Sequence, residues 1–140
     1  PANPTTGYTW NMTEYDKNLP VLTDYPPLEA KHSLAQIISE AGLLQLHIAE
    51  TVKYAHVTYF FNGERREPFQ NEKWLLVPSP DIAHFEQTPE MSANEVVKIA
   101  LANLLKYDFI LINFSNADMV GHTGDFDATV KALEALDSCI

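Results

Sequence analysis

The chain has 140 residues, of which 46% are apolar and 11% aromatic, as expected for one ordered globular domain and not for a disordered segment. Its 19 acidic and 9 basic residues give a formal net charge of −10, which repels nucleic acid and anionic membranes, so neither is an expected partner. No apolar stretch is long enough to cross a bilayer. The single cysteine, Cys139, excludes an internal disulfide and fits a reducing compartment, so a cytoplasmic location is expected.

The first 32 residues are expected to form a lead-in segment with one strand and a proline-rich loop. Pro20, Pro26 and Pro27 interrupt regular structure between residues 18 and 31. From residue 33 onward, apolar spacing changes to alternating helices and strands. The pattern predicts a helix over 33–41, with Gly42 as its C-cap, and a short strand over 44–49.

Residues 51–61 fit two structures. The Asn62-Gly63 pair could turn a hairpin or could end a helix. Helical spacing of the apolar residues after Thr51 favours the helix, which is our prediction.

The rest of the chain continues the alternation of strands and helices. A short strand over 74–77 is closed by Pro78, and Ser92 with Glu95 forms the pattern of a capping box that opens a helix through residue 106. A buried strand over 109–114 follows, and then an amphipathic helix from about residue 125. This order predicts an α/β fold with a largely parallel sheet flanked by helices.

Asp118 and His122 follow the strand over 109–114, so they lie at its carboxyl end, where open α/β sheets bind ligands. A carboxylate and an imidazole together suit manganese or zinc better than calcium. Gly121 would allow a tight turn that brings both side chains to one point. The same two residues could also be a turn former and a solvated surface histidine, so the spacing by itself leaves both readings open.

The sequence around this pair resembles the manganese-binding segment of cofactor-independent (2,3-bisphosphoglycerate-independent) phosphoglycerate mutases, which belong to the alkaline phosphatase superfamily. Four further segments match the same family in the same order. The resemblance extends from about Met12 to the end of the chain, and the matching segments are Asn113 to Phe126, Met12 to Asp16, Ala49 to Gly63, Pro78 to Pro80 and Pro89 to Ser92.

The resemblance implies that the parent protein interconverts 3-phosphoglycerate and 2-phosphoglycerate through a phosphoserine intermediate and two Mn²⁺ ions, for which Zn²⁺, Mg²⁺ or Co²⁺ could substitute. It assigns Asp118 and His122 as metal ligands and Lys53 as a catalytic residue that stabilises charge on the phosphoryl group. It also implies a small phosphorylated substrate and a monomeric parent enzyme. Residues 33–140 would be an incomplete alkaline-phosphatase-like domain, part of a larger enzyme.

The family's serine nucleophile, its substrate-binding arginines and its remaining metal ligands have no counterpart in residues 1–140, so the isolated chain is expected to be inactive. Ser79, between two prolines, is not in a nucleophile elbow and is not proposed as the nucleophile. Two other functions stay open: another metal-dependent phosphomutase, phosphatase or sulfatase of the superfamily, or a folded module without catalysis. The remaining histidines are expected to lie outside the site, as packing, surface or supporting residues: His32, His47, His56 and His84.

Overall fold

A parallel sheet forms the centre of the computed structural model, which describes residues 9–14, 18–25 and 30–140. In these residues the sheet has the strand order β4-β3-β5, and its strands are β3 (Gln45–Glu50), β4 (Glu72–Val77) and β5 (Phe109–Asn113). β3 pairs in parallel with both neighbours, and the register runs from Gln45, opposite Glu72 and Phe109, to the carboxyl ends. The predicted α/β fold with a parallel sheet is therefore confirmed.

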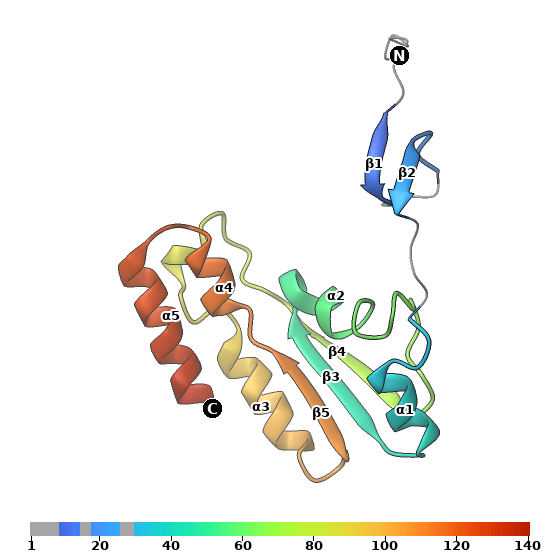
Figure 1. Ribbon diagram of the computed structural model, residues 1–140. Helices are drawn as coiled ribbons and strands as arrows, with labels where there is room; N and C mark the ends of the chain where they lie inside the picture. The colour runs from blue at the N-terminus through green and yellow to red at the C-terminus, as the bar shows by residue number, and fades with distance from the viewer. Residues whose placement is uncertain (1–8, 15–17, 26–29) are drawn as a thin grey trace.

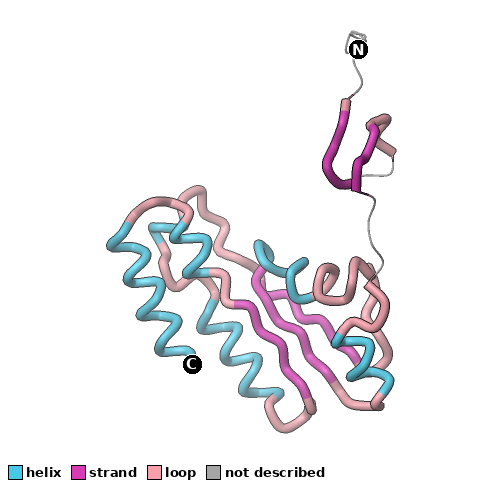
Figure 2. Tube along the Cα trace, viewed as in Figure 1, coloured by secondary structure: helices cyan, strands magenta, loops and turns pink. Residues whose placement is uncertain are grey.

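Helices cover both faces of this sheet (Figures 1 and 2). The short helices α1 (Leu34–Glu40) and α2 (Tyr54–Val57) lie on one face, and α3 (Ala93–Asn103) lies on the other, with α5 (Phe126–Cys139) beyond it. The smaller elements are the 3-10 turns η1 (Thr51–Lys53) and η2 (Phe85–Gln87) and the helix α4 (Asn116–Gly121). None of the helices in the described residues is long and apolar enough to span a membrane.

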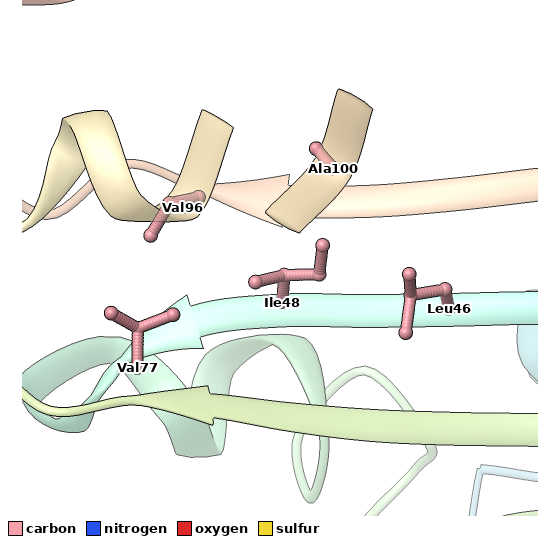
Figure 3. Close-up of a cluster of buried hydrophobic side chains, with 5 residues drawn as sticks. All are labelled: Leu46, Ile48, Val77, Val96 and Ala100. Carbon is pink, nitrogen blue, oxygen red and sulfur yellow. The ribbon is translucent and has the colours of Figure 1, made fainter. Parts of the chain in front are cut away.

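One face of β3 is apolar. Leu46 and Ile48 are fully buried and pack against Val96 and Ala100 of α3, together with Val77 at the end of β4 (Figure 3). Because alternate residues of a strand point to opposite faces, these two β3 side chains belong to the same side of the sheet. Burial of such aliphatic side chains contributes about 1.5–3 kcal/mol each, which makes this cluster the main apolar support of α3.

The opposite face of β3 is polar and equally buried. Gln45 donates from Nε2 to the carbonyl oxygen of Ala35 in α1 (2.7 Å). Nδ1 of His47 lies 2.7 Å from the carbonyl oxygen of Val57, the last residue of α2. His47 has no exposed surface, which excludes the surface alternative of the prediction and leaves the supporting one: its period-2 position on β3 places it under α2.

Glu72 of β4 accepts most of the hydrogen bonds on this polar face. Its Oε1 lies 3.1 Å from Nδ1 of His47, and Asn62 Nδ2 donates to both carboxylate oxygens at 2.9 Å. The backbone N–H of Phe69 donates to Oε2 (2.6 Å), and the Trp74 indole N–H donates to Oε1. One carboxylate therefore ties the segment between α2 and β4 to the sheet, and its burial is compensated by these donors.

The predicted loop over 18–31 contains a strand. β2 (Leu22–Tyr25) pairs in parallel with β1 (Trp10–Thr13), with Trp10 opposite Leu22. The part of the predicted loop at 26–29 lies outside the described residues. Pro20 stands before this four-residue run, so it precedes the strand without removing one of its ladder hydrogen bonds.

The helix predicted over 51–61 forms only in part. η1 and α2 together reach Val57, and Thr58 leaves the helical region at φ −119° and ψ −92°. Turns then lead to Gly63 at φ +69°, where an added Cβ would lie 2.8 Å from the Cβ of Ala30. β3 and β4 pair in parallel, so the Asn62-Gly63 pair does not turn a hairpin, but it also does not end the helix, which stops at Val57. The β-branched and aromatic residues after His56 explain the early end of α2.

α3 begins without the predicted capping box. Ser92 is its N-cap residue, but the Ser92 side chain makes no capping hydrogen bond to the helix. The Ser92 hydroxyl instead donates to the carbonyl oxygen of Pro78 (2.8 Å). The prediction was wrong here because an acceptor distant in sequence takes the hydroxyl; α3 also ends at Asn103, earlier than predicted.

Glu50, at the carboxyl end of β3, is completely buried. Its Oε1 accepts a hydrogen bond from the backbone N–H of Ser92 (3.1 Å), while Oε2 has no partner in the part of the chain that is described. Burial raises the pKa of the Glu50 carboxyl, and hydrogen bonds from Ser92 and Ser79 oppose that rise only in part.

Removing the Glu72 carboxylate should strongly destabilise the fold. Glu72→Ala leaves the side-chain N–H groups of Asn62 and Trp74 without their shared acceptor, and each buried donor left unsatisfied costs about 1–3 kcal/mol. The matched control is Glu95→Ala, which removes an exposed pair with Lys98 worth about 1 kcal/mol or less. Equal losses for the two variants in denaturant unfolding would contradict this role of Glu72.

Replacing Glu50 with glutamine should stabilise the protein in a pH-dependent way. The folded-state pKa of Glu50 lies above its ordinary value of 4.5, so the folded state retains this proton at pH values where the unfolded state has lost it. The cost of the ionised carboxylate is absent below about pH 4.5 and is complete above the folded-state pKa. Glu50→Gln should therefore exceed the wild type in unfolding free energy at about pH 7, and a gain of the same size at about pH 4 would refute the assignment.

Candidate functional site

Two neighbouring strands carry the predicted site residues to the same edge of the sheet. Ala49 of β3 lies opposite Asn113 of β5, so the two strands end side by side. β3 leads directly into η1, which ends at Lys53, and β5 leads after two residues into α4, which contains Asp118. The predicted position at the carboxyl edge is therefore what the topology produces.

Lys53 and Asp118 form an ion pair across this edge. The Nζ of Lys53 contacts Oδ2 of Asp118, and the two side chains are 19% and 46% exposed. The Nε2 of His122 lies 3.4 Å from the other carboxylate oxygen, Oδ1, and the His122 side chain is 75% exposed. The three residues named from the sequence thus meet around one carboxylate, open to solvent.

The segment around Asp118 is a short helix and not the predicted loop. Asp118 lies in the first turn of α4, and His122, its C-cap residue, donates its backbone N–H to the carbonyl oxygen of Asp118 (3.0 Å). One helical turn, and not a strained turn at Gly121, brings the two side chains to the same side. Between α4 and α5 the glycine with a positive φ is Gly124 (+78°).

α4 is held in place by α5. Asn116 donates from Nδ2 to the carbonyl oxygen of Ala132 (2.7 Å), and this hydrogen bond is buried. Val120 is fully buried against Ala128 and Ala132. The side of α4 opposite the solvent is therefore fixed, which limits the positions that Asp118 and His122 can take.

Three positive or polar groups act on Asp118. The Lys53 ammonium is the main cause that lowers the pKa of Asp118; partial burial opposes this effect, and His122 and His56 add smaller contributions that also lower it. Asp118 is therefore an ionised carboxylate over the whole neutral range. Sequence reasoning placed His56 outside the site, although its position three residues after Lys53 is a spacing that can put two side chains on one face of a helix.

Asp118 and His122 fit a shared metal ion in geometry. Two ligand atoms at about 2.1 Å from one ion and at a tetrahedral angle lie about 3.4 Å apart. The observed distance between Oδ1 and Nε2 is 3.4 Å, and a carboxylate with an imidazole is a donor set for Mn²⁺ or Zn²⁺. Within the described residues, no group of three or more His, Cys, Asp or Glu side chains could hold a metal, so these two would be part of a ligand set.

The chain matches one protein-family profile and several phosphoglycerate mutases of known sequence. The profile of the metalloenzyme superfamily matches residues 16–140. The 2,3-bisphosphoglycerate-independent phosphoglycerate mutase of Legionella pneumophila (strain Philadelphia 1) is 51% identical over 139 residues, which are 98% of this chain and 27% of that protein. The mutase of the same name from Moorella thermoacetica is 53% identical over 129 residues, or 92% of this chain and 25% of that protein.

The fold has a counterpart among solved structures. The structure of Leishmania mexicana phosphoglycerate mutase at low cobalt concentration superposes with a TM-score of 0.82 and 34% sequence identity, covering 93% of this chain and 25% of that chain. The chain thus spans about a quarter of the length of the relatives it matches. With a profile match over residues 16–140, the chain belongs to the metalloenzyme superfamily.

Proposed function

We propose that this segment belongs to a cofactor-independent phosphoglycerate mutase, an isomerase that interconverts 3-phosphoglycerate and 2-phosphoglycerate. The observation that carries the proposal is the meeting of Lys53, Asp118 and His122 at the carboxyl edge of the sheet. The named mutases that share half of this sequence support the choice of reaction.

In the proposed mechanism Lys53 acts on the phosphoryl group. An ammonium that lies mostly buried beside Asp118 offers a compact positive charge for phosphoryl oxygens as charge develops on them. Asp118 holds this ammonium through Oδ2, which fixes its direction before substrate binds. Preorganised charge of this kind stabilises a transition state without reorganisation at the moment of reaction.

Asp118 Oδ1 and His122 Nε2 would hold a divalent metal ion, which we propose to be Mn²⁺. When bound, the metal would polarise the phosphoryl oxygens and stabilise the negative charge on the group that is transferred. Ligation requires the neutral form of His122 and the ionised form of Asp118. Lys53, which lowers the pKa of Asp118, keeps that carboxylate ionised.

The charge distribution suits a phosphorylated substrate. The chain as a whole is strongly acidic, with a formal net charge of −10, which repels an anionic substrate at long range. Lys53 balances the negative charge of Asp118 locally, and a bound divalent ion would make this edge of the sheet positive. A small phosphorylated acid could therefore bind at this edge of the sheet in preference to the remaining surface.

The rest of the active site belongs to other parts of the proposed enzyme. A serine that carries the phosphoryl group between the two hydroxyls of glycerate, a second metal ion and the remaining ligands complete this proposal. We further propose that the full-length enzyme is a cytoplasmic monomer. By itself the chain should be nearly inert, because two ligands hold a divalent ion weakly.

Replacing Asp118 tests the metal assignment. In the full-length protein, Asp118→Ala should abolish mutase activity and lower the bound Mn²⁺ while the unfolding free energy changes little, because Asp118 is partly exposed. Asp127→Ala, an exposed carboxylate in the first turn of α5, is the matched control. Phosphoglycerate and ribose phosphate should be assayed together, since turnover of the sugar phosphate alone would replace the proposed reaction with another phosphomutase reaction.

Replacing Lys53 separates its role from metal binding. Lys53→Ala should lower kcat by about a hundredfold to a thousandfold, the usual effect of removing one electrostatic partner of the transition state. Lys53→Arg should recover only part of the rate because a planar guanidinium cannot take the place of a compact ammonium. Lys98→Ala, a surface lysine on α3, is the control.

Both Lys53 variants should retain their metal, measured on the preparations used for kinetics. If Lys53→Ala keeps more than about half of the wild-type rate, Lys53 is a structural partner of Asp118 and has no part in phosphoryl transfer.

A further inference from the structure

The amino-terminal residues of the turn that carries Lys53 form hydrogen bonds with Ser79, which lies in the loop after β4. η1 has no side-chain capping bond from its own N-cap residue, Glu50. The backbone N–H of Val52, one of the amides without a partner inside such a turn, donates to Oγ of Ser79 (3.5 Å). The backbone N–H of Ser79 donates in return to Oγ1 of Thr51 (3.2 Å).

Ser79 is itself fixed by the start of α3. The Ser92 hydroxyl donates to the carbonyl oxygen of Pro78, the residue before Ser79 (2.8 Å), and the Ser92 backbone N–H donates to Oε1 of Glu50 (3.1 Å). Glu50 and Thr51 are consecutive residues, so the hydrogen bonds close a circuit through three chain segments at the carboxyl edge. We call this set the edge circuit: Glu50, Thr51, Val52, Pro78, Ser79 and Ser92.

The edge circuit is stiff as well as closed. Pro78 and Pro80 flank Ser79, and each proline ring fixes its own φ. Glu50 is fully buried at the end of the central strand, so one corner of the circuit cannot move without disturbing the sheet. Lys53 follows Val52 directly and reaches Asp118 from the end of this turn.

We propose that Ser79 is a positioning residue. It holds the turn η1 in the position from which the Lys53 ammonium reaches Asp118 and the phosphoryl group. The proposal rests on the proposed function for its kinetic consequence, and on the hydrogen bonds of the edge circuit for its geometry. Ser79 does not touch the reacting atoms. Its effect on the reaction passes through Lys53, and displacement of a catalytic group by about 1 Å can cost about a hundredfold in rate.

The test compares three serine variants of the full-length protein. Ser79→Ala removes the acceptor for the Val52 amide and should lower kcat about tenfold or more, with KM and bound metal within about twofold of wild type. Ser79→Thr keeps the hydroxyl and should restore most of the rate. Ser39→Ala is the control. The Ser39 hydroxyl, in α1, donates to the backbone carbonyl oxygen of Gln70 (2.6 Å), so this variant removes a serine hydrogen bond between distant segments that lies outside the edge circuit.

A structural readout makes the proposal independent of catalysis. Ser79→Ala should speed the hydrogen exchange of the Val52 amide and weaken the nuclear Overhauser contact between the Lys53 and Asp118 side chains, and Ser39→Ala should change neither. A wild type without mutase activity would overturn the proposed function while these two measurements still decide the role of Ser79. An unchanged Lys53–Asp118 contact in Ser79→Ala, or equal kcat losses for Ser79→Ala and Ser39→Ala, would overturn the positioning role.

Discussion

β3 is buried along its whole length, and each of its two faces meets a different kind of neighbour. Leu46 and Ile48 pack against α3, and Gln45 and His47 bind backbone carbonyls of α1 and α2. Apolar packing is tolerant of small sliding movements, whereas hydrogen bonds between buried groups fix distance and direction. The polar face therefore sets where α2 lies, and α2 follows directly on the turn that carries Lys53.

The site depends on this arrangement because its groups come from separate strands. Lys53 follows β3 and Asp118 follows β5. The distance between their charged groups therefore depends on the register between the two strands. The two strands are buried or partly buried throughout, and register slips would move every side chain of β3 to the wrong face. A partly exposed ion pair by itself contributes little to stability. Here its value is in orienting an ammonium that is 19% exposed.

The sequence allowed prediction of the features that repeat along it or lie close together in it. The helix over 33–41, the strands of the sheet and their parallel order follow from apolar spacing, and Gly42 has the positive φ of a C-cap glycine (+76°). The edge position of Asp118 followed from the strand before it. The features that were missed depend on partners distant in sequence. The buried His47 contacts Glu72 of the neighbouring strand, and the Ser92 hydroxyl donates to the carbonyl oxygen of Pro78 instead of capping its own helix. α4 was missed because six residues with a glycine give too short a helical pattern to detect.

The start of α3 has a consequence for the order in which the chain can assemble. A capping box would let this helix begin from its own residues, but the Ser92 hydroxyl binds Pro78 and the Ser92 amide binds Glu50, 42 residues earlier in the chain. Both acceptors occupy their places only when β3 and β4 are paired. The amino-terminal turn of α3 is therefore completed after the strands pair, which couples helix formation to sheet formation and makes folding of this region cooperative.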